Sequence, residues 1–395
     1  MWGQQLDFRI NQRLPKGRDD PALICHNPTT LAGNPIDFTL GNKIQEETDF
    51  ESKAMKFSRF YNSLDGLWRH NFSTRLFFSD RSAVMVMSDG KESLFSPSPE
   101  GYISDANVGI LLKEGNSWRY NGLNNQTMFF SASGELTQIN KSDGVVYKLT
   151  YTRTDKGPEI TVNNSYGESL VIVEDFTRQL KSIRAGTKHI VFSYDAYENL
   201  SERKSTDAGI VSITKYHYES AYKNSFLTGI TDARGVRFAT WAYNDSGRPI
   251  SSQHADNAGS VKIRYLDDGY RVVTNELGKN TTYRYENISG KLRLVQIIGE
   301  PSPNCPASNS SYTYNERGQV LTKTDAKGLI TAYTYSERGL ETSRTEASGT
   351  AQARTVITEW DPSRFLPTKI TEPTRITAFT YDDQGRETGR QVTLR

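Results

Sequence analysis

Three stretches of the chain share one pattern and decide the fold: Tyr312-Thr313-Tyr314 before Asn315-Glu316-Arg317-Gly318, Tyr333-Thr334-Tyr335 before Ser336-Glu337-Arg338-Gly339, and Phe379-Thr380-Tyr381 before Asp382-Asp383-Gln384-Gly385. Each is an aromatic-x-aromatic step that runs into a short segment ending in glycine. The second aromatic of such a step recurs at Tyr151, Tyr194, Tyr218, Tyr243, Tyr265, Tyr285, Tyr314, Tyr335, Trp360 and Tyr381. From Tyr194 onward the spacing is 20 to 29 residues, which predicts structural repeats joined by loops of variable length.

Each repeat has the physical character of two β-strands. Residues two apart on a strand share a face, so Tyr333 and Tyr335 point one way and Thr334 points the other. Tyr, Thr, Val and Ile suit a pleated, half-buried surface. Gly339 can adopt positive φ, which lets the chain reverse direction. We therefore predict an all-β fold, a curved strip of antiparallel hairpins, with no long helical segment.

The composition agrees with a β protein whose core is built from rings. Hydrophobic residues make up 35% of the chain and the mean hydropathy is -0.63, which by itself indicates weak burial. The 21 Tyr and 17 Phe compensate, because each ring can bury roughly 150 to 250 Å². The length of 395 residues, taken with the repeat, favours one large architecture over several ordinary domains.

Charge and cysteine content argue against several classes of function. Lys plus Arg number 48 against 46 Asp plus Glu, without a basic block, so a nucleic-acid partner is not predicted. Cys25 and Cys305 lie 280 positions apart; two unpaired thiols are favoured, and a bridge stays open. We predict no membrane span, because no apolar run is long enough, and no Sec signal at the start of this chain.

The histidines and cysteines predict no catalytic, cofactor or metal site. Cys25 and His26 could suggest a thiolate and its base, but sequence neighbours rarely form such a dyad. We expect His70 to be a packed, hydrogen-bonded residue. The other three histidines are scattered along the chain without metal-ligand spacing. They are His189, His217 and His254.

The carboxylates and glycines of residues 41–49 admit a functional and a structural interpretation. Glu46, Glu47 and Asp49 could form a carboxylate pair for glycoside hydrolysis, since alternate strand residues share a face. Solvated or turn-capping carboxylates are the favoured interpretation. Gly41-Asn42-Lys43 lacks the spacing of a P-loop. The aromatic steps could line a carbohydrate platform, but ten of them favour a core or a shell lining.

The chain divides into three predicted regions. Residues 1–32 are polar and proline-containing, which predicts an extended arm. Residues 33–80 form a distinct N-terminal module. Residues 81–395 form the β-strip, with degenerate repeats first and regular repeats later.

Residues in the module and in the repeats carry a resemblance to a known family. In the module they are Gly33-Asn34-Pro35, Gly41-Asn42-Lys43, Glu47 with Asp49, Arg59-Phe60-Tyr61-Asn62-Ser63 and Gly66-Leu67-Trp68-Arg69-His70-Asn71. In the repeats, Tyr381-Asp382-Asp383-Gln384-Gly385-Arg386 is the nearest copy of a Tyr-Asp-x-x-Gly-Arg turn. The chain resembles, over residues 33–395, the RHS (rearrangement hotspot) proteins, which combine such an N-terminal domain with YD repeats.

The resemblance implies a structural protein, not an enzyme. In RHS proteins the β-strip spirals into a hollow shell that encloses a C-terminal toxin until delivery to a competitor or host, often by type VI secretion. RHS shells usually run longer and close with an Asp-Pro-x-Gly core motif, where two Asp residues cut the toxin free. Only one more strand follows Tyr381 here. We therefore expect an incomplete shell, without toxin or autoproteolytic motif.

Two functional hypotheses follow from this resemblance. The first is a shell segment whose partners are a toxin cargo or the remaining shell, together with a component of a secretion system. Such a bacterial protein is cytoplasmic before export and secreted or on the cell surface afterwards. The alternative is a YD-repeat module that binds carbohydrate or a cell surface. A charged inner face favours the first, and exposed coplanar rows of Tyr and Trp favour the second. The oligomeric state stays open.

Overall fold

The computed structural model describes residues 30–79, 81–99, 101–104, 109–122, 125–288, 290–299, 309–362, 364–383 and 385–395. Cys25, His26, Cys305 and nearly all of the predicted arm lie outside these residues. Within them the chain forms β-strands almost throughout, with no α-helix and a single 3-10 turn at Ala255–Asn257. The all-β prediction is confirmed.

The strands form two antiparallel sheets. The first sheet has the order β1 to β5: β1 (Leu31–Ala32), β2 (Ile36–Asp37), β3 (Asn42–Glu51), β4 (Lys56–Asn62) and β5 (Leu67–His70). The second, which we call the strip, begins with β6 (Arg75–Phe78), β7 (Ala83–Val86), β8 (Glu92–Ser98), β9 (Gly101–Ser104), β10 (Gly109–Glu114), β11 (Ser117–Gly122), β12 (Thr127–Phe130) and β13 (Leu136–Asn140).

The strip then continues with each strand paired to the next. Its middle strands are β14 (Val146–Thr154), β15 (Gly157–Asn164), β16 (Ser169–Glu174), β17 (Leu180–Ala185), β18 (Lys188–Tyr194), β19 (Leu200–Asp207), β20 (Ile210–His217), β21 (Gly229–Thr231), β22 (Arg237–Tyr243), β23 (Pro249–His254) and β24 (Val261–Tyr265). Its later strands are β25 (Tyr270–Thr274), β26 (Asn280–Ile288), β27 (Lys291–Gly299), β28 (Ser310–Tyr314), β29 (Val320–Thr324), β30 (Ile330–Tyr335), β31 (Glu341–Glu346), β32 (Arg354–Trp360), β33 (Pro367–Thr371), β34 (Arg375–Tyr381) and β35 (Glu387–Leu394).

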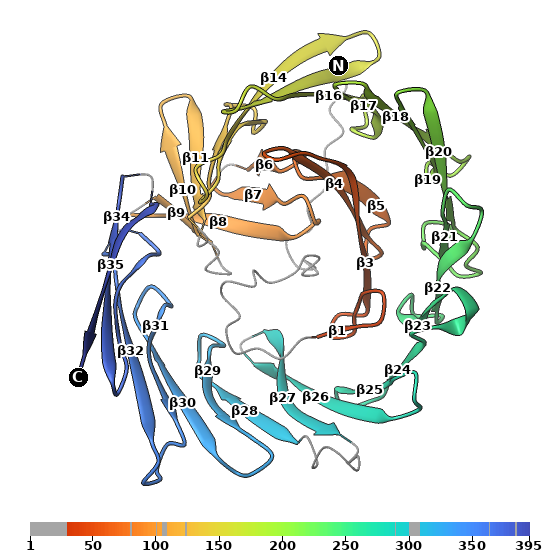
Figure 1. The fold of residues 1–395 in the computed structure, drawn as a ribbon. Helices are drawn as coiled ribbons and strands as arrows, with labels where there is room; N and C mark the ends of the chain where they lie inside the picture. The colour runs from red at the N-terminus through yellow and green to blue at the C-terminus, as the bar shows by residue number, and fades with distance from the viewer. Residues whose placement is uncertain are drawn as a thin grey trace.

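The strip curves into a wall that surrounds the first sheet (Figure 1). We call the side that faces the first sheet the concave face. Strands β6 to β13 curl back on themselves, because Arg75 of β6 forms an isolated antiparallel bridge with Glu135 and Leu76 N–H donates to Gly134 O at 3.0 Å. The far end does not close by strand pairing: among the described residues β35 pairs with β34 alone.

A recurring β-bulge explains the curvature. The register shifts at the second aromatic of the step in seven strands, at Tyr194, Tyr243, Tyr285, Tyr314, Tyr335, Trp360 and Tyr381. A bulge puts one extra residue on one strand, which bends that strand and increases its twist. Because this bulge recurs at these aromatic steps, the bends add up and the sheet curves.

The turn after the step is fixed by a side-chain cap. Asn315 Oδ1 accepts hydrogen bonds from the backbone N–H of Arg317 and of Gln319, both at 3.0 Å. Gly318 has a φ of +74°, the left-handed region that the sequence pattern requires there. Asp382 Oδ1 accepts from Arg386 N–H at 2.8 Å in the same way. An Asp or Asn after the aromatic therefore sets the turn.

The wall meets itself after one revolution. Asn125, in the turn between β11 and β12, donates from Nδ2 to the carbonyl of Phe365, between β32 and β33, at 3.4 Å. Gly144, between β13 and β14, lies against Arg386, between β34 and β35, whose Cδ is 3.4 Å from the place of a Cβ. Both contacts join turns that are 21 strands apart along the strip. The turns along one edge of the strip therefore meet turns of the opposite edge at the same separation of 21 strands in both places, and we call these two edges its rims.

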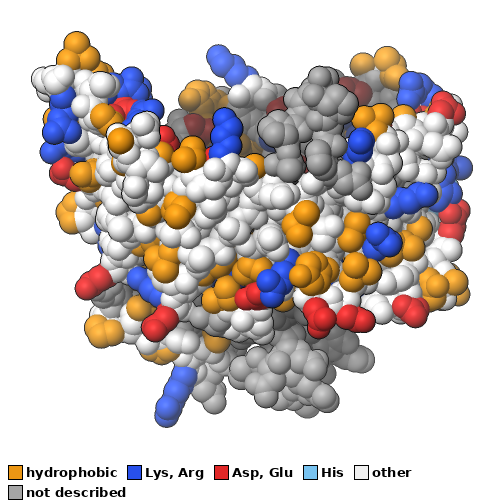
Figure 2. All heavy atoms as spheres, turned by 90° about the horizontal axis from the view of Figure 1, so that it is seen from below, with side chains coloured by type: hydrophobic (Ala, Val, Ile, Leu, Met, Phe, Trp, Pro, Cys, Tyr) orange, Lys and Arg blue, Asp and Glu red, His pale blue; other side chains and the backbone are white. Residues whose placement is uncertain are grey.

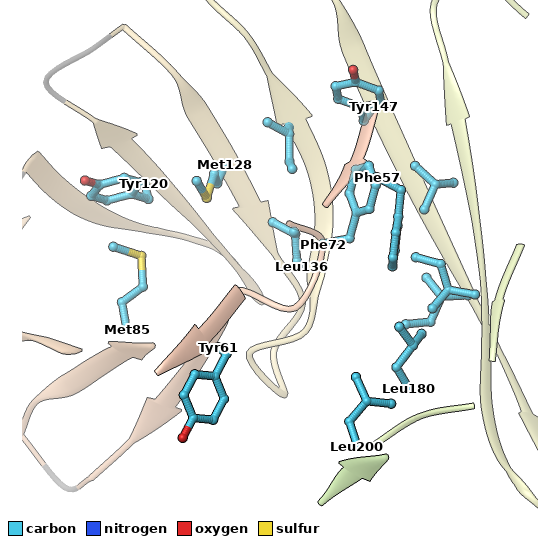
Figure 3. Packing of buried hydrophobic residues seen from close by; sticks show 14 of the residues in the cluster. Phe57, Tyr61, Phe72, Met85, Tyr120, Met128, Leu136, Tyr147, Leu180 and Leu200 are labelled. Carbon is cyan, nitrogen blue, oxygen red and sulfur yellow. The ribbon is translucent and has the colours of Figure 1, made fainter. Parts of the chain in front are cut away.

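The core lies between the first sheet and the concave face. Phe72, which follows β5, packs edge-on against Tyr147 of β14 with ring centroids 5.5 Å apart, and against Phe57 of β4 at 6.3 Å (Figure 3). On the outer side of the wall, hydrophobic and charged side chains are interspersed (Figure 2). The predicted register is confirmed at β30, where Tyr333 is 4% exposed, Tyr335 is half-buried and Thr334 is exposed.

Candidate functional site on the concave face

The tyrosines of the repeats form a ladder of hydrogen bonds. In seven repeats the hydroxyl of the second aromatic donates to a backbone carbonyl on, or just before, the preceding strand, and Trp360 Nε1 does the same to Glu341 O at 2.8 Å. The pairs are Tyr151 to Leu136, Tyr194 to Leu180, Tyr243 to Leu227, Tyr265 to Pro249, Tyr314 to Leu294, Tyr335 to Val320 and Tyr381 to Pro367, at 2.6 to 2.9 Å. A buried phenol thus keeps its polar end satisfied. Burial raises the pKa of Tyr151 to about 12.

Tyr218 and Tyr285 instead have hydroxyl partners in the N-terminal module. Trp68 Nε1 donates to the Tyr218 hydroxyl at 2.9 Å. Thr39 Oγ1 donates to the Tyr285 hydroxyl at 3.1 Å. The module therefore uses positions of the ladder as its attachment points.

A buried charge cluster joins the module to β19 and β20. Asp49 of β3 is 2% exposed and forms an ion pair with Arg59 of β4, and its Oδ1 lies 2.6 Å from Arg203 Nε on β19. Arg59 Nη2 also donates to the Tyr216 hydroxyl at 2.8 Å. Burial alone would lower the Arg59 pKa, but the adjacent Asp49 carboxylate outweighs it, and the pKa is raised above its usual value.

Aromatic rings complete the surroundings of Arg59. Its guanidinium carbon lies 4.8 Å from the ring centre of Phe192 and 4.9 Å from that of Trp68. A planar guanidinium is less strongly hydrated than an ammonium and stacks on such rings. The sequence suggested a solvated or turn-capping carboxylate at Asp49, and this prediction is wrong. Asp49 is a buried structural anion that two arginines share.

The other two carboxylates of that segment do not join the cluster. Glu46 is exposed and pairs with Lys56 at 3.4 Å. Glu47 Oε1 accepts from Gln45 Nε2 at 2.7 Å. A glycosidase needs two carboxyl groups across a sugar cleft. These three carboxylates instead have separate partners, which supports a structural role.

His70 is packed and hydrogen-bonded, as expected. It is 2% exposed, and its Nε2 lies 2.8 Å from Glu174 Oε1 on β16. Since Nδ1 accepts from Phe72 N–H at 3.3 Å, Nε2 is the nitrogen that carries the proton toward Glu174. Arg178 Nε lies 2.9 Å from the second oxygen of Glu174. This group links β5 to β16.

Lys43 is a buried cation that the sequence did not indicate. It is fully buried, and its Nζ donates to Asn34 O at 2.8 Å, Ile44 O at 2.7 Å and Gln45 Oε1 at 2.7 Å. The Trp241 ring on β22 lies 4.0 Å away, and Trp241 Nε1 donates to Asn34 O at 2.7 Å. Three acceptors and a ring face satisfy an ammonium fully. Its role in this structure is to hold the module to the wall.

Tyr61 and Trp68 anchor the module to the middle of the strip. Tyr61 OH donates to Ser225 O at 2.7 Å and accepts from Leu227 N–H at 3.0 Å. Both contacts lie in the segment between β20 and β21. The module therefore lies on the concave face of the middle strands of the strip.

The remaining histidines are not brought together. His189 lies on β18, His217 on β20 and His254 on β23. Within the described ranges no group of three or more His, Cys, Asp or Glu is arranged to hold a metal ion. In that same part of the chain no helix is long and apolar enough to cross a membrane.

The strands that carry this geometry also carry a family signature. Residues 314–351, which run from the last residue of β28 through β31 and include Tyr335 and the capped turns, match the family model of the RHS repeat. The chain contains an RHS repeat. Residues 33–95 match a second family model, a domain of unknown function named DUF6531.

Solved structures of similar architecture are much longer than this RHS-repeat chain. The crystal structure of TcdB2-TccC3 is 12% identical with a TM-score of 0.43, over 98% of this chain and 21% of the other. The Photorhabdus luminescens Tc holotoxin pore with the TccC3-D651A mutation is 12% identical with a TM-score of 0.42, over 79% of this chain and 19% of the other. The chain spans about a fifth of these structures. A search of curated proteins returned no match.

Proposed function

We propose that this RHS-repeat protein is a wall segment of a shell that encloses a toxin polypeptide for delivery between bacteria. The observation that carries the proposal is the concave face itself. The module covers one part of it through buried hydrogen bonds and ion pairs, and the wall curves around the module (Figure 1). A surface that holds one folded polypeptide segment by its backbone and side chains is suited to hold another.

The ladder geometry favours the shell over the carbohydrate-binding alternative. Glycan platforms present exposed aromatic faces, whereas the repeat aromatics here are buried or half-buried and donate their hydroxyls within the wall. The wall charge that contacts the module, on Arg203, lies on the enclosed side and pairs with Asp49 of the module. Both observations support a lining rather than a sugar platform.

We further propose that the chain has no catalytic activity of its own and acts as a scaffold. Its partners are then a toxin cargo or further shell strands, and export through a secretion system would place it outside the cell. The proposal is supported by the structural roles of His70, Asp49 and Lys43, each fully engaged with protein groups.

The test is co-expression of this chain with the polypeptide encoded next to it. We expect the two to elute together in size exclusion and the partner to resist trypsin that digests it alone. Separate elution, with the partner digested at its free rate, would refute the shell. Turnover of peptide, glycan or nucleic-acid substrates by the purified chain, abolished in Glu47→Gln, would show an enzyme instead.

A further inference from the structure

The concave face from β32 to β35 presents a line of β-branched side chains that includes Ile370 and Val392. Cross-strand partners share a face, and the register pairs Thr358 with Ile370, Ile370 with Thr377 and Thr377 with Val392. Alternate residues on the same strands add further apolar side chains to this face. They are Val356, Trp360 and Phe379.

This line is far less buried than its counterpart under the module. Tyr216 is 4% exposed and Tyr285 is 2% exposed, whereas Trp360 and Tyr381 are half-buried and Val392 is 56% exposed. Hydrogen bonds from the first sheet and its loops reach the wall at Asp89 and at positions from Tyr147 to Tyr285. In Figure 1, β3 to β5 lie beside the β16 to β24 arc, and β30 to β35 lie on the other side of the enclosed space.

The first described residues of the chain lie inside the wall. Thr30 O accepts from Phe38 N–H at 3.1 Å, and Asn34 N–H donates to Ser252 Oγ on β23 at 3.0 Å. From β23 to β35 there are twelve strand steps, a path of about 58 Å along the wall. The 19 residues between Ile10 and Thr30 can extend to about 66 Å. They are long enough to bring residues 6–10 to this face.

The sequence of that segment has the matching chemistry. Leu6, Phe8 and Ile10 alternate with Asp7 and Arg9, so an extended backbone presents one apolar and one charged side. With its apolar side against the wall, such a segment would turn Asp7 and Arg9 toward the enclosed space.

We propose that residues 6–10 bind in extended form across the concave face of β32 to β35, with Leu6, Phe8 and Ile10 against Val356, Ile370 and Val392. The segment is a built-in ligand for the part of the wall that the module leaves uncovered. This contact lies within one chain and does not depend on the proposed cargo.

Photo-crosslinking in the full chain tests this binding. Benzoylphenylalanine replaces Phe8 in one variant and Asp7 in a matched control, and cross-linked peptides are identified by mass spectrometry. We expect the position 8 probe to label peptides within residues 354–394, with a several-fold lower yield from position 7. Ile370→Asp should lower the position 8 yield several-fold while the circular dichroism spectrum stays unchanged.

Each other outcome overturns the proposal. Labelling confined to β14 to β26 would place the segment with the module. A cross-linked dimer would assign the face to a second copy of the chain. An absence of labelling would show that the segment stays in solvent. As a second measurement, deleting residues 1–29 should accelerate amide exchange in β32 to β35 and leave exchange in β15 to β18 unchanged. If the deletion changed the exchange rates of both groups of strands by the same factor, or changed neither, the contact would also be refuted.

Discussion

The Tyr335 hydroxyl on β30 donates to the carbonyl oxygen of Val320 on β29, the strand paired with it, at 2.9 Å. Val320 lies directly after the preceding capped turn, and hydrogen bonds of the same kind join Tyr314 of β28 to Leu294 of β27 and Tyr381 of β34 to Pro367 of β33. The tyrosine of each of these repeats thus contacts the backbone of the strand immediately before its own. This contact joins consecutive strands along the wall.

Tyr335→Phe should lower the free energy of unfolding by about 0.5 to 1.5 kcal/mol, since it removes one hydrogen bond and leaves the Val320 carbonyl without it. Tyr333→Ala should cost more, about 3 to 5 kcal/mol, because that ring is 4% exposed. Urea melts of both variants measure the difference. The matched control is Thr334→Ala, an exposed change expected within about 0.5 kcal/mol of wild type. Equal effects for all three would contradict the assigned faces.

Asp49→Asn should destabilise the fold by about 3 to 5 kcal/mol, because Arg59 and Arg203 would keep their buried charges without a counter-charge. Glu46→Gln is the matched control on the same strand. Its exposed pair with Lys56 is worth about 0 to 1 kcal/mol. Thermal unfolding of the two variants side by side checks the ranking, and a harmless Asp49→Asn would show that the cluster is not a structural requirement.

Alkaline pH should unfold the chain. Burial raises the pKa of Tyr151, Tyr314 and Tyr333 from 10.0 to about 12. Between these values the unfolded tyrosines lose protons that the folded ones keep, so stability is complete below pH 10 and falls as the pH rises through about 12.

A pH titration followed at 295 nm and by far-UV circular dichroism measures this loss. Tyrosine ionisation and loss of β-structure should occur together. Tyr151→Phe removes one of these groups and should make the alkaline transition less steep. Ionisation of the ladder tyrosines near pH 10 with the β-signal intact would contradict their burial.

Removing residues 1–72 should make the chain associate. The deletion takes away the partners of Tyr216, Tyr218 and Trp241 and leaves the aromatic concave face to solvent. Light scattering at matched protein concentration measures the association. Trp68→Phe, which removes the hydrogen bond to Tyr218 and part of the ring beside Arg59 but keeps the module in place, should remain in the same state as wild type. A monomeric deletion variant would show that the module does not cover this surface.

Local rules were sufficient to predict the repeat unit. The alternation of Tyr333, Thr334 and Tyr335 and the glycine of each turn follow from a two-residue period and from φ preferences, which depend on neighbouring residues only. The structure confirms both. The hydrogen bonds of the ladder hydroxyls and the bulge at each second aromatic were not predicted, because both depend on a partner strand.

The interpretation of residues 41–49 shows where sequence reasoning fails. Lys43 and Asp49 occur in a strand that reads as polar and half-exposed, yet both are buried. Their partners Trp241 and Arg203 are far away in sequence, so no spacing rule connects them.

The sequence by itself determined that this protein is an all-β strip of aromatic hairpins with an N-terminal module, because strand alternation and turn chemistry are short-range. Only the tertiary structure decided that the module lies within the wall, that Asp49 joins Arg59 to Arg203, and that the rims meet 21 strands apart. Those relations come from bends and twists accumulated over many strands, and a small change in each strand would move the meeting point.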